Sequence, residues 1–296
     1  MSCPSLRKDS LMDWPNDAPF AAAITFDMDA DSLIHAADPD GWQRPYAISM
    51  GQYGPTVGLP RILDTYRRFG MRQTFFIPGW CVKTYPKAVE AILAGGHEIG
   101  CHGWIHENPH ARSRAEQAED LDRAIDALAA FSGTRPRGYR APVYALTNDT
   151  PALIADRGFT YDSSMMADDD PYALDLGGRT LIEIPPHWGI DDWPPFAHYA
   201  EIGYMMPVRG PTEGLAPFFE EFEAARAEAG LWHAVWHPFL TGRRARWQVV
   251  ERWLETALTS GAWFATLAEI ADHAETLRRA GRLRTLPFPT YTGRQT

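Results

Sequence analysis

The stretch FAAAITFD, residues 20–27, decides the fold class and leads straight into Asp27-Met28-Asp29. An unbroken apolar run of this length is typical of a buried parallel strand. In an extended backbone residues i and i+2 project to one side, so Asp27 and Asp29 point into the same pocket. Two carboxylates at so short a distance repel each other unless a cation lies between them or one of them accepts a proton. A solvated turn is the alternative interpretation of this pair alone.

Further apolar runs alternate with helical patterns along the chain. Strands are predicted at residues 73–78, 97–102, 138–142, 159–163, 181–185 and 231–237, and helices at 58–69, 86–94, 113–133, 150–158, 212–229 and 247–260. Ser113 and Glu116 form a capping box, and Gly133 ends that helix. Roughly seven strand–helix alternations predict an α/β fold with parallel strands. We expect a closed or nearly closed barrel, with an open doubly wound sheet as the alternative.

Composition narrows the class of protein. The chain has 296 residues, of which 45% are hydrophobic and 22% charged, and no internal repeat or linker divides it, so we expect one domain over residues 1–296. The net charge of −10 argues against nucleic-acid partners. Neither GxGxxG nor GxxxxGK[ST] occurs, so a nucleotide cofactor has no support.

The compartment is predicted from cysteines and apolar runs. Cys3, Cys81 and Cys101 are few and lack CxxC spacing, which is typical of a reduced protein. The first 17 residues contain no apolar run of signal-peptide length, and no stretch approaches the ~18 apolar residues of a membrane helix. We therefore expect a cytoplasmic protein that does not bind membranes.

Three more motifs follow predicted strands. His102-Gly103-Trp104-Ile105-His106 places two imidazoles at a spacing suited to one zinc-like ion, although histidines are more often surface or core residues. Arg140, just before Pro142, could clamp a carboxylate, with a structural salt bridge as the alternative. His237 follows an apolar strand and suits a general acid. The carboxyl ends of barrel strands are where barrel enzymes build active sites, so these positions reinforce one another.

The four motifs together resemble the polysaccharide deacetylase superfamily, also called NodB-homology or carbohydrate esterase family four. The matching segments are Thr25-Phe26-Asp27-Met28-Asp29, His102-Gly103-Trp104-Ile105-His106, Arg140-Ala141-Pro142 and His237-Pro238. The resemblance spans about residues 22–238, and a helical C-terminal part is expected at 246–280. It implies a single-domain, irregular (β/α)7–8 barrel.

The resemblance also implies roles for individual residues. Asp29, His102 and His106 would hold one divalent metal ion, expected to be zinc. Asp27 would be the general base, with Arg140 orienting it and His237 serving as the general acid. These are expectations carried over from the family's motifs.

Departures from the usual pattern indicate a branch of the family. Met28 separates the two aspartates, Gly103 replaces Ser or Thr, and Val143 replaces Tyr, although the Val143 backbone amide could still donate to an oxyanion. These departures, and residues 51–63, resemble the branch with cyclic imidases, allantoinase-like proteins and cytoplasmic peptidoglycan deacetylase homologues. That branch implies a homo-oligomer.

Softer features surround the motifs. Trp80 and Trp193 are candidates for lining the substrate pocket, although core packing is the usual role of Trp. Residues 165–193 are rich in acids and loops, which fits a lid, a specificity loop, a solvated insertion or a subunit contact.

Two hypotheses of function follow. The first is a metal-dependent hydrolase of a non-peptide C–N bond that opens a small cyclic imide or amide. N-deacetylation of an N-acetylated sugar, oligosaccharide or peptidoglycan fragment is the alternative within this class. The second is a barrel that binds metal and carbohydrate without turnover. The presence of both Asp27 and His237 argues against it, because a metal site alone needs neither.

Overall fold

The computed structural model describes residues 12–38, 40–200 and 203–289. The strands are β1 Ala21–Asp27, β2 Thr74–Ile77, β3 Glu98–Cys101, β4 Gly138–Tyr139, β5 Tyr161–Asp162, β6 Tyr172–Asp175, β7 Thr180–Glu183, β8 Leu231–Trp236, β9 Trp263–Phe264 and β10 Thr285–Pro287. The helices are α1 Ser32–Ala37, α2 Pro45–Tyr53, α3 Leu59–Phe69, α4 Gly79–Thr84, α5 Pro86–Ala94, α6 Arg114–Ser132, α7 Thr150–Asp156, α8 Trp193–Phe196, α9 Pro211–Glu228, α10 Arg244–Ala257 and α11 Leu267–Arg279. Short turns of helix lie between them, among them Pro142–Tyr144 and Trp188–Ile190.

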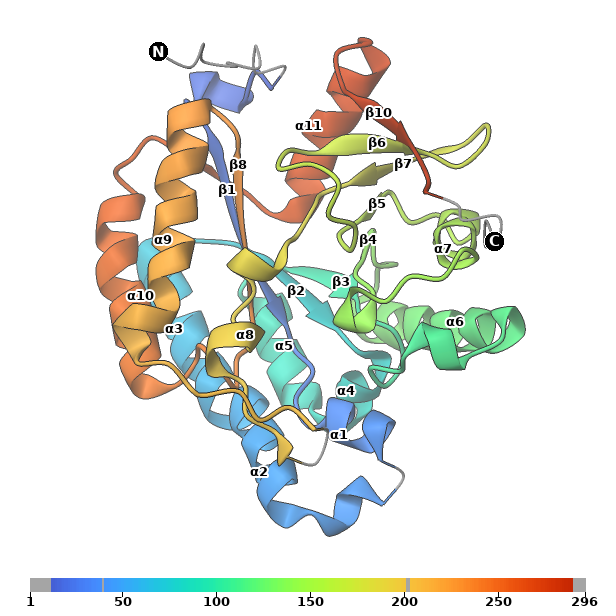
Figure 1. The fold of residues 1–296 in the computed structure, drawn as a ribbon, viewed down its shortest axis with the longest axis vertical. Helices are drawn as coiled ribbons and strands as arrows, with labels where there is room; N and C mark the ends of the chain where they lie inside the picture. Colours follow the sequence, from blue (N-terminus) through green and yellow to red (C-terminus); the bar gives the residue numbers. More distant parts are fainter. Residues whose placement is uncertain (1–11, 39, 201–202, 290–296) are drawn as a thin grey trace, which may run out of the picture.

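One sheet organises the molecule (Figure 1). Its order is β10-β6-β7-β5-β4-β3-β2-β1-β8, with β9 also paired to β1. From β8 through β1 to β7 every pairing is parallel, and only the β6–β7 hairpin is antiparallel. The predicted single-domain, irregular (β/α) barrel is confirmed, and within the described residues its ladder forms an open path from β10 to β8.

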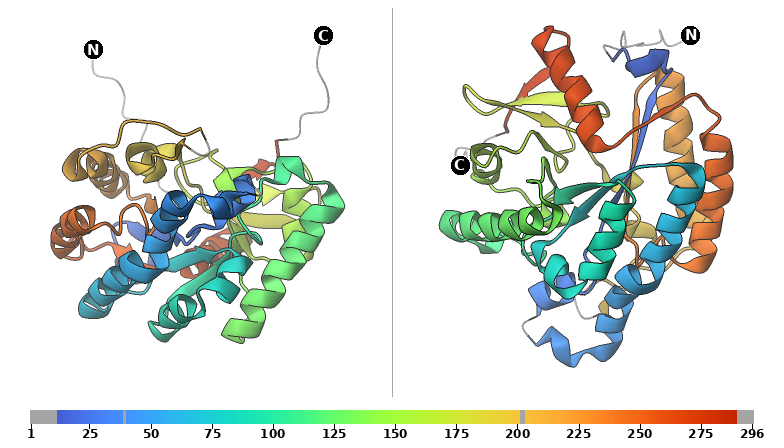
Figure 2. Two further views of the ribbon diagram at one scale, coloured as in Figure 1. Left: turned by 90° about the horizontal axis from the view of Figure 1, so that it is seen from below. Right: turned by 180° about the vertical axis from the view of Figure 1, so that it is seen from behind.

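Burial explains why the first strand occupies the middle of the fold. All seven residues of β1 are buried, as expected for a parallel strand that is covered on both faces. Figure 2 shows helices α10, α3, α5 and α6 following one another along the outer side of the sheet. Between helices and sheet, the ring of Phe26 packs on Phe75, Tyr66, Trp236 and Trp247. Much of the tryptophan content therefore serves the core.

Most predicted elements are found within a few residues of their expected ends. The helix after Ser113 has the capping box, and Gly133 ends it with φ of 76°. The strand expected at 181–185 is β7, and it pairs with β6, an unexpected strand in the loop-rich segment 165–193. One expectation needs correction. The part expected to be helical, 246–280, contains β9, whose pairing with β1 requires an extended backbone.

Candidate active site

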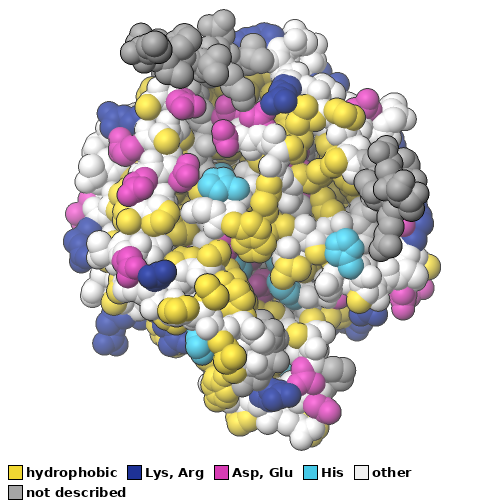
Figure 3. Space-filling model, viewed as in Figure 1, with side chains coloured by type: hydrophobic (Ala, Val, Ile, Leu, Met, Phe, Trp, Pro, Cys, Tyr) yellow, Lys and Arg dark blue, Asp and Glu magenta, His cyan; other side chains and the backbone are white. Residues whose placement is uncertain are grey.

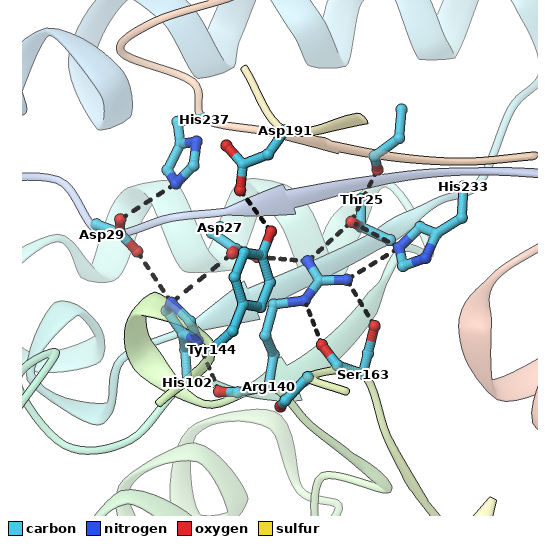
Figure 4. Close-up of polar contacts among 12 residues, drawn as sticks. Thr25, Asp27, Asp29, His102, Arg140, Tyr144, Ser163, Asp191, His233 and His237 are labelled. Atoms are coloured by element: carbon cyan, nitrogen blue, oxygen red, sulfur yellow. Dashed lines mark hydrogen bonds and ion pairs between the residues drawn. The ribbon is translucent and has the colours of Figure 1, made fainter. Parts of the chain in front are cut away.

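The ends of β1, β3, β4 and β8 bring the predicted motifs together (Figure 4). Asp29 lies at the centre of the group. Its Oδ1 is 3.4 Å from Nε2 of His102, and its Oδ2 is 3.5 Å from Nε2 of His106 and 3.4 Å from Nε2 of His237. Neighbouring parallel strands end at one edge of the sheet, which explains how residues far apart in the sequence meet here.

The surroundings of Asp29 fit a divalent metal ion. Its side chain is 1% exposed, and neither carboxylate oxygen has a hydrogen-bond partner within the described residues. Buried carboxylates are normally paired or coordinate a metal. One ligand atom each from Asp29, His102 and His106 lie within 4.8 Å of one another. An Asp and two His are donors that zinc accepts, and three protein ligands are typical of a catalytic zinc site.

Each of the two histidines in this group can offer the lone pair of a ring nitrogen to a metal ion. Nδ1 of His102 lies 2.7 Å from the carbonyl oxygen of Arg140. Because a carbonyl only accepts, that nitrogen carries the proton and Nε2 is left free toward Asp29. Burial lowers the pKa of His106 despite the opposing effect of Asp29, which favours the neutral imidazole.

Asp27 is held as an ionised carboxylate. Its Oδ1 accepts a hydrogen bond of 2.7 Å from Nη1 of Arg140, and its Oδ2 lies 3.8 Å from Nε2 of His102. Burial by itself would raise the pKa of Asp27, but the positive charge of Arg140, followed by His102 and His237, lowers it below its ordinary value. A buried carboxylate kept charged beside the candidate metal site can accept a proton.

His237 is oriented by a carboxylate from the loop after β7. Its Nδ1 donates to Oδ1 of Asp192 over 2.6 Å, which directs Nε2 toward Asp29. Oδ2 of Asp192 accepts from the backbone N–H of His237 and of Thr241, and from the Thr241 hydroxyl. Burial lowers the pKa of His237, but Asp192 outweighs it, with smaller help from Asp29, and raises the pKa to about 10. The imidazolium form suits a proton donor.

Comparison with known proteins identifies the family. A sequence model of polysaccharide deacetylases matches residues 49–161. A peptidoglycan deacetylase of Helicobacter pylori is 31% identical over 259 residues, covering 78% of this chain and 88% of the relative. The chain belongs to the polysaccharide deacetylase family.

Solved structures of related proteins agree with this assignment. A Mycobacterium smegmatis protein assigned as a polysaccharide deacetylase is 35% identical, with a TM-score of 0.88 over 95% of this chain and 98% of that one. Puue allantoinase is 21% identical, with a TM-score of 0.77 over 89% of this chain and 93% of that one, and shares the fold. As a polysaccharide deacetylase family member the chain is a hydrolase of amide C–N bonds, which confirms the expected family and enzyme class.

Tyr144 also lines this deacetylase-family site. Figure 4 shows the ring of Tyr144 in front of Asp27 and Arg140, and its hydroxyl donates to Asp191. Asp191 also accepts a 2.7 Å hydrogen bond from the backbone of Trp193. Burial is the main reason why the pKa of Asp191 rises to about 6.

Backbone strain gathers around the same residues. Of seven non-glycine residues with positive φ in the described chain, four, Ala30, His106, Val143 and Tyr144, belong to the segments around the site, with φ between 49° and 65°, a left-handed conformation that side chains disfavour. Val143 is 54% exposed, and the proposed role of its amide as an oxyanion donor stays a prediction. Such strain tends to cluster at functional sites, where the surrounding structure enforces it.

The two predicted pocket tryptophans differ in their surroundings. Trp193 lies at the site, with its ring edge-on to His237 at 5.9 Å and stacked on Tyr199 at 5.7 Å. Trp80 packs its ring against His35 and Tyr85 instead. The geometry therefore brings Trp193, but not Trp80, into contact with the predicted catalytic residues.

Three acidic or phenolic residues of the site were not singled out from the sequence as site residues. They are Tyr144, Asp191 and Asp192. The run Asp191-Asp192-Trp193 could have indicated them. The other acidic residues of the same segment instead favoured the interpretation of a solvent-exposed insertion. Figure 3 shows acidic and histidine side chains deep in a hollow between apolar side chains on this face.

Among helices of the described residues, none combines the length and apolar character that crossing a membrane requires.

Proposed function

We propose that this chain is a metal-dependent hydrolase that opens a small cyclic imide or amide. The observation that carries the metal part of the proposal is the buried Asp29 carboxylate, whose two oxygens face three imidazole nitrogens and have no hydrogen-bond partner in the described part of the chain. Asp29, His102 and His106 would hold the ion, which we propose to be zinc. A divalent ion at such a site supplies Lewis acidity toward a carbonyl oxygen and toward water.

The protein's own residues would carry the proton transfers. Asp27, ionised and fixed by Arg140, would take the proton of the attacking water. His237, held by Asp192 with Nε2 directed to the centre, would donate its proton to the departing nitrogen. Opposite protonation states of a neighbouring base and acid are what acid–base catalysis of hydrolysis needs. The backbone amide of Val143 is our candidate donor to the oxyanion.

The depth of the site supports a small substrate. Asp27, Asp29, His102 and His237 are each at most 5% exposed, and the rings of Tyr144 (Figure 4) and Trp193 lie beside this group. A substrate must bring its scissile carbonyl down to these groups, which is easier for a compact ring than for a polymer. N-deacetylation of an N-acetylated sugar or peptidoglycan fragment is the second candidate, and the Helicobacter pylori relative named a peptidoglycan deacetylase supports it.

A turnover assay tests the proposal and separates the two candidates. The zinc-loaded protein would be given succinimide, hydantoin and N-acetylglucosamine oligomers, with Asp27→Asn as the matched inactive control. We expect hydrolysis of the imides and little of the oligomers. Release of acetate from the oligomers alone would select the second candidate.

We also propose that the chain self-associates. The exposed apolar side chains of Trp42, Tyr46 and Met205 are candidates for the contact surface. Light scattering during size-exclusion chromatography gives the mass in solution, and a monomer at working concentration would contradict the proposal.

A further inference from the structure

The guanidinium of Arg140 has an acceptor for each of its five N–H groups. Nε donates to the carbonyl of Ser163 at 3.1 Å, and Nη1 donates to Thr25 Oγ1 at 2.9 Å and to Asp27 Oδ1 at 2.7 Å. Nη2 lies 2.8 Å from Ser163 Oγ and 2.9 Å from His233 Nε2. Five donors are all that a guanidinium has, so its orientation is completely determined by these partners.

The contact between Arg140 and His233 fixes the tautomer of the histidine. A guanidinium cannot accept a hydrogen bond, so Nε2 of His233 must be the unprotonated, accepting nitrogen. Thr25 Oγ1 lies 3.2 Å from the same nitrogen, but it can donate to the carbonyl of Ala234 at 2.9 Å. The proton of a neutral His233 then resides on Nδ1, which faces the carbonyl of Pro185 at 3.4 Å. Burial, followed by the charge of Arg140, lowers the pKa of His233 well below its ordinary value and agrees with a neutral ring.

His233 lies on β8, beside the strand that carries Asp27. It is paired in register with Ala23 of β1; Asp27 is the last residue of β1, and His237 directly follows β8. The guanidinium also lies over the ring of Phe76 at 4.2 Å. Gly100 permits that arrangement, because a Cβ there would come within 2.5 Å of the Phe76 ring. Contact with the Phe76 ring alone would let the guanidinium turn within its plane, and the acceptors around it, His233 and Ser163 at Nη2 among them, oppose that turn.

We propose that His233 is a positioning residue for the general base: as the Nδ1-protonated tautomer it accepts the Nη2–H of Arg140 and thereby holds Nη1 on Asp27. Its catalytic consequence rests on the function proposed above. The tautomer and the restraint on Arg140 do not depend on the identity of the substrate.

Three variants test the proposal. His233→Phe keeps a buried ring and removes the acceptor, whereas His233→Gln restores an accepting oxygen. His97→Phe is the matched control, because His97 is also buried, accepts through Nδ1 from the backbone N–H of Gln73 at 3.1 Å, and packs between Tyr66 and Phe75 away from Arg140.

Kinetics give the first readout. Misplacing a catalytic group by about 1 Å costs on the order of 10²-fold, so we expect His233→Phe to lower kcat by roughly that factor. We expect KM to change less than about twofold, because the substrate contacts remain, and His233→Gln to recover most of kcat. His97→Phe should lower the Tm and leave kcat near the wild-type value. A folded His233→Phe protein with wild-type kcat would overturn the proposal.

Nitrogen-15 NMR gives a second readout that needs no substrate. In the wild type we expect the His233 signals of an Nδ1-protonated neutral ring and slow solvent exchange of the Arg140 Nε–H. His233→Phe should accelerate that exchange, and His233→Gln and His97→Phe should not. An Nε2-protonated ring, or equal exchange in all four proteins, would refute the proposal even where turnover is found. Absence of turnover with these NMR results intact would refute only the proposed function.

Discussion

The carboxylate of Asp192 and the imidazole of His237 form a buried pair joined by a 2.6 Å hydrogen bond at Nδ1. The second oxygen of Asp192 accepts hydrogen bonds from the backbone N–H groups of His237 and Thr241. Asp192 therefore fixes both the side chain and the main chain of His237. The pair therefore determines both where the proposed general acid points and how firmly it keeps its proton.

Removing the negative charge of Asp192 should alter the pH dependence. Asp192 is the main group that raises the pKa of His237, and burial opposes it. In Asp192→Asn the pKa should fall to or below the ordinary value of about 6.5. The acid would then lose its proton at lower pH, and the basic limb of the kcat profile should move to lower pH. A basic limb at the wild-type position would contradict this assignment.

Metal content should depend on Asp29. We expect about one zinc-like ion per chain in the wild type, and less than roughly a tenth of that in Asp29→Asn or His102→Ala, because each loses one of three ligands. Elemental analysis of the purified proteins measures this. Chelator should abolish turnover, and added zinc should restore it.

The acids next to the site supply a control for metal binding. Asp191, Asp192 and His237 form a second group of ligand atoms within reach of one another. Asp191→Asn should keep the ion if it lies between Asp29, His102 and His106. Loss of the ion from Asp191→Asn, with retention in Asp29→Asn, would place the ion in the second group.

Asp27→Asn should keep the metal and lose turnover. The asparagine oxygen still accepts from Arg140, so the fold should persist, but the proton acceptor is gone. Loss of a general base typically costs about 10²–10⁴-fold in kcat. Elemental analysis and kinetics on the same sample check both statements. Should Asp27→Asn lose the ion while Asp29→Asn retains it, the roles of the two carboxylates are exchanged.

His237→Ala should slow turnover by a factor that depends on the leaving group. A general acid matters most when the departing nitrogen is strongly basic, and an imide nitrogen departs more easily than an amine. The variant should retain relatively more activity on imides of low nitrogen pKa and almost none on N-acetyl amines, with metal content unchanged. Rates across imides of graded nitrogen pKa measure this. An equal loss on every substrate would assign His237 to substrate positioning, and loss of the ion would make it a fourth ligand.

A buried pair of carboxyl groups behind the site should make stability depend on pH. Burial raises the pKa of Asp162 to about 6 and that of Glu183 well above its ordinary value. Both groups bind protons more tightly when folded, so the contribution of this pair to stability is fully present below about pH 4 and is lost as the pH rises through about 6 and above. In Glu183→Gln the amide nitrogen can donate to Asp162, while its oxygen keeps accepting from the N–H groups of Ser164 and Met165. We expect stabilisation on the order of 1–3 kcal/mol at pH 7–8, vanishing near pH 4, by chemical denaturation.

Glu98→Gln is the matched comparison for that substitution. Glu98 is a half-buried glutamate of the same sheet, but its oxygens accept from the hydroxyls of Tyr161 and Thr74 and from the N–H of Ala268. An amide nitrogen in place of the oxygen that faces Tyr161 would leave that hydroxyl without its acceptor, so this substitution should destabilise the protein at pH 7. If both variants change stability in the same direction, repulsion between Asp162 and Glu183 is not the cause.

The sequence predicted the parts of the fold that local chemistry determines. Apolar runs, the capping box at Ser113 and Gly133 at the end of its helix placed most strands and helices. β7 was expected as the strand at 181–185, but β6 escaped prediction because it is only four residues long and lies in a segment rich in acids. Their place in the sheet depends on pairing with β5 and β10, which no local pattern reveals.

The site was predictable to the extent that its residues lie at strand ends. Asp27, Asp29, His102, Arg140 and His237 meet as expected. Asp192 reaches His237 across 45 positions of sequence from a segment whose acids look solvated. Likewise the contact of His233 with Arg140 follows from the register of β1 and β8, which spacing along the chain does not encode.

The left-handed backbone at Val143 marks a position where stability and the proposed role in catalysis would compete. A β-branched residue is poorly suited to φ of 49°, and glycine would adopt it without steric cost. Selection for thermal stability alone would favour replacing Val143, yet a glycine would also free the segment that carries Tyr144 to its partner Asp191. Natural enzymes commonly keep such costly positions where activity depends on them. Attempts to make this protein more heat-resistant by consensus or library methods should therefore treat this turn separately from the rest of the surface.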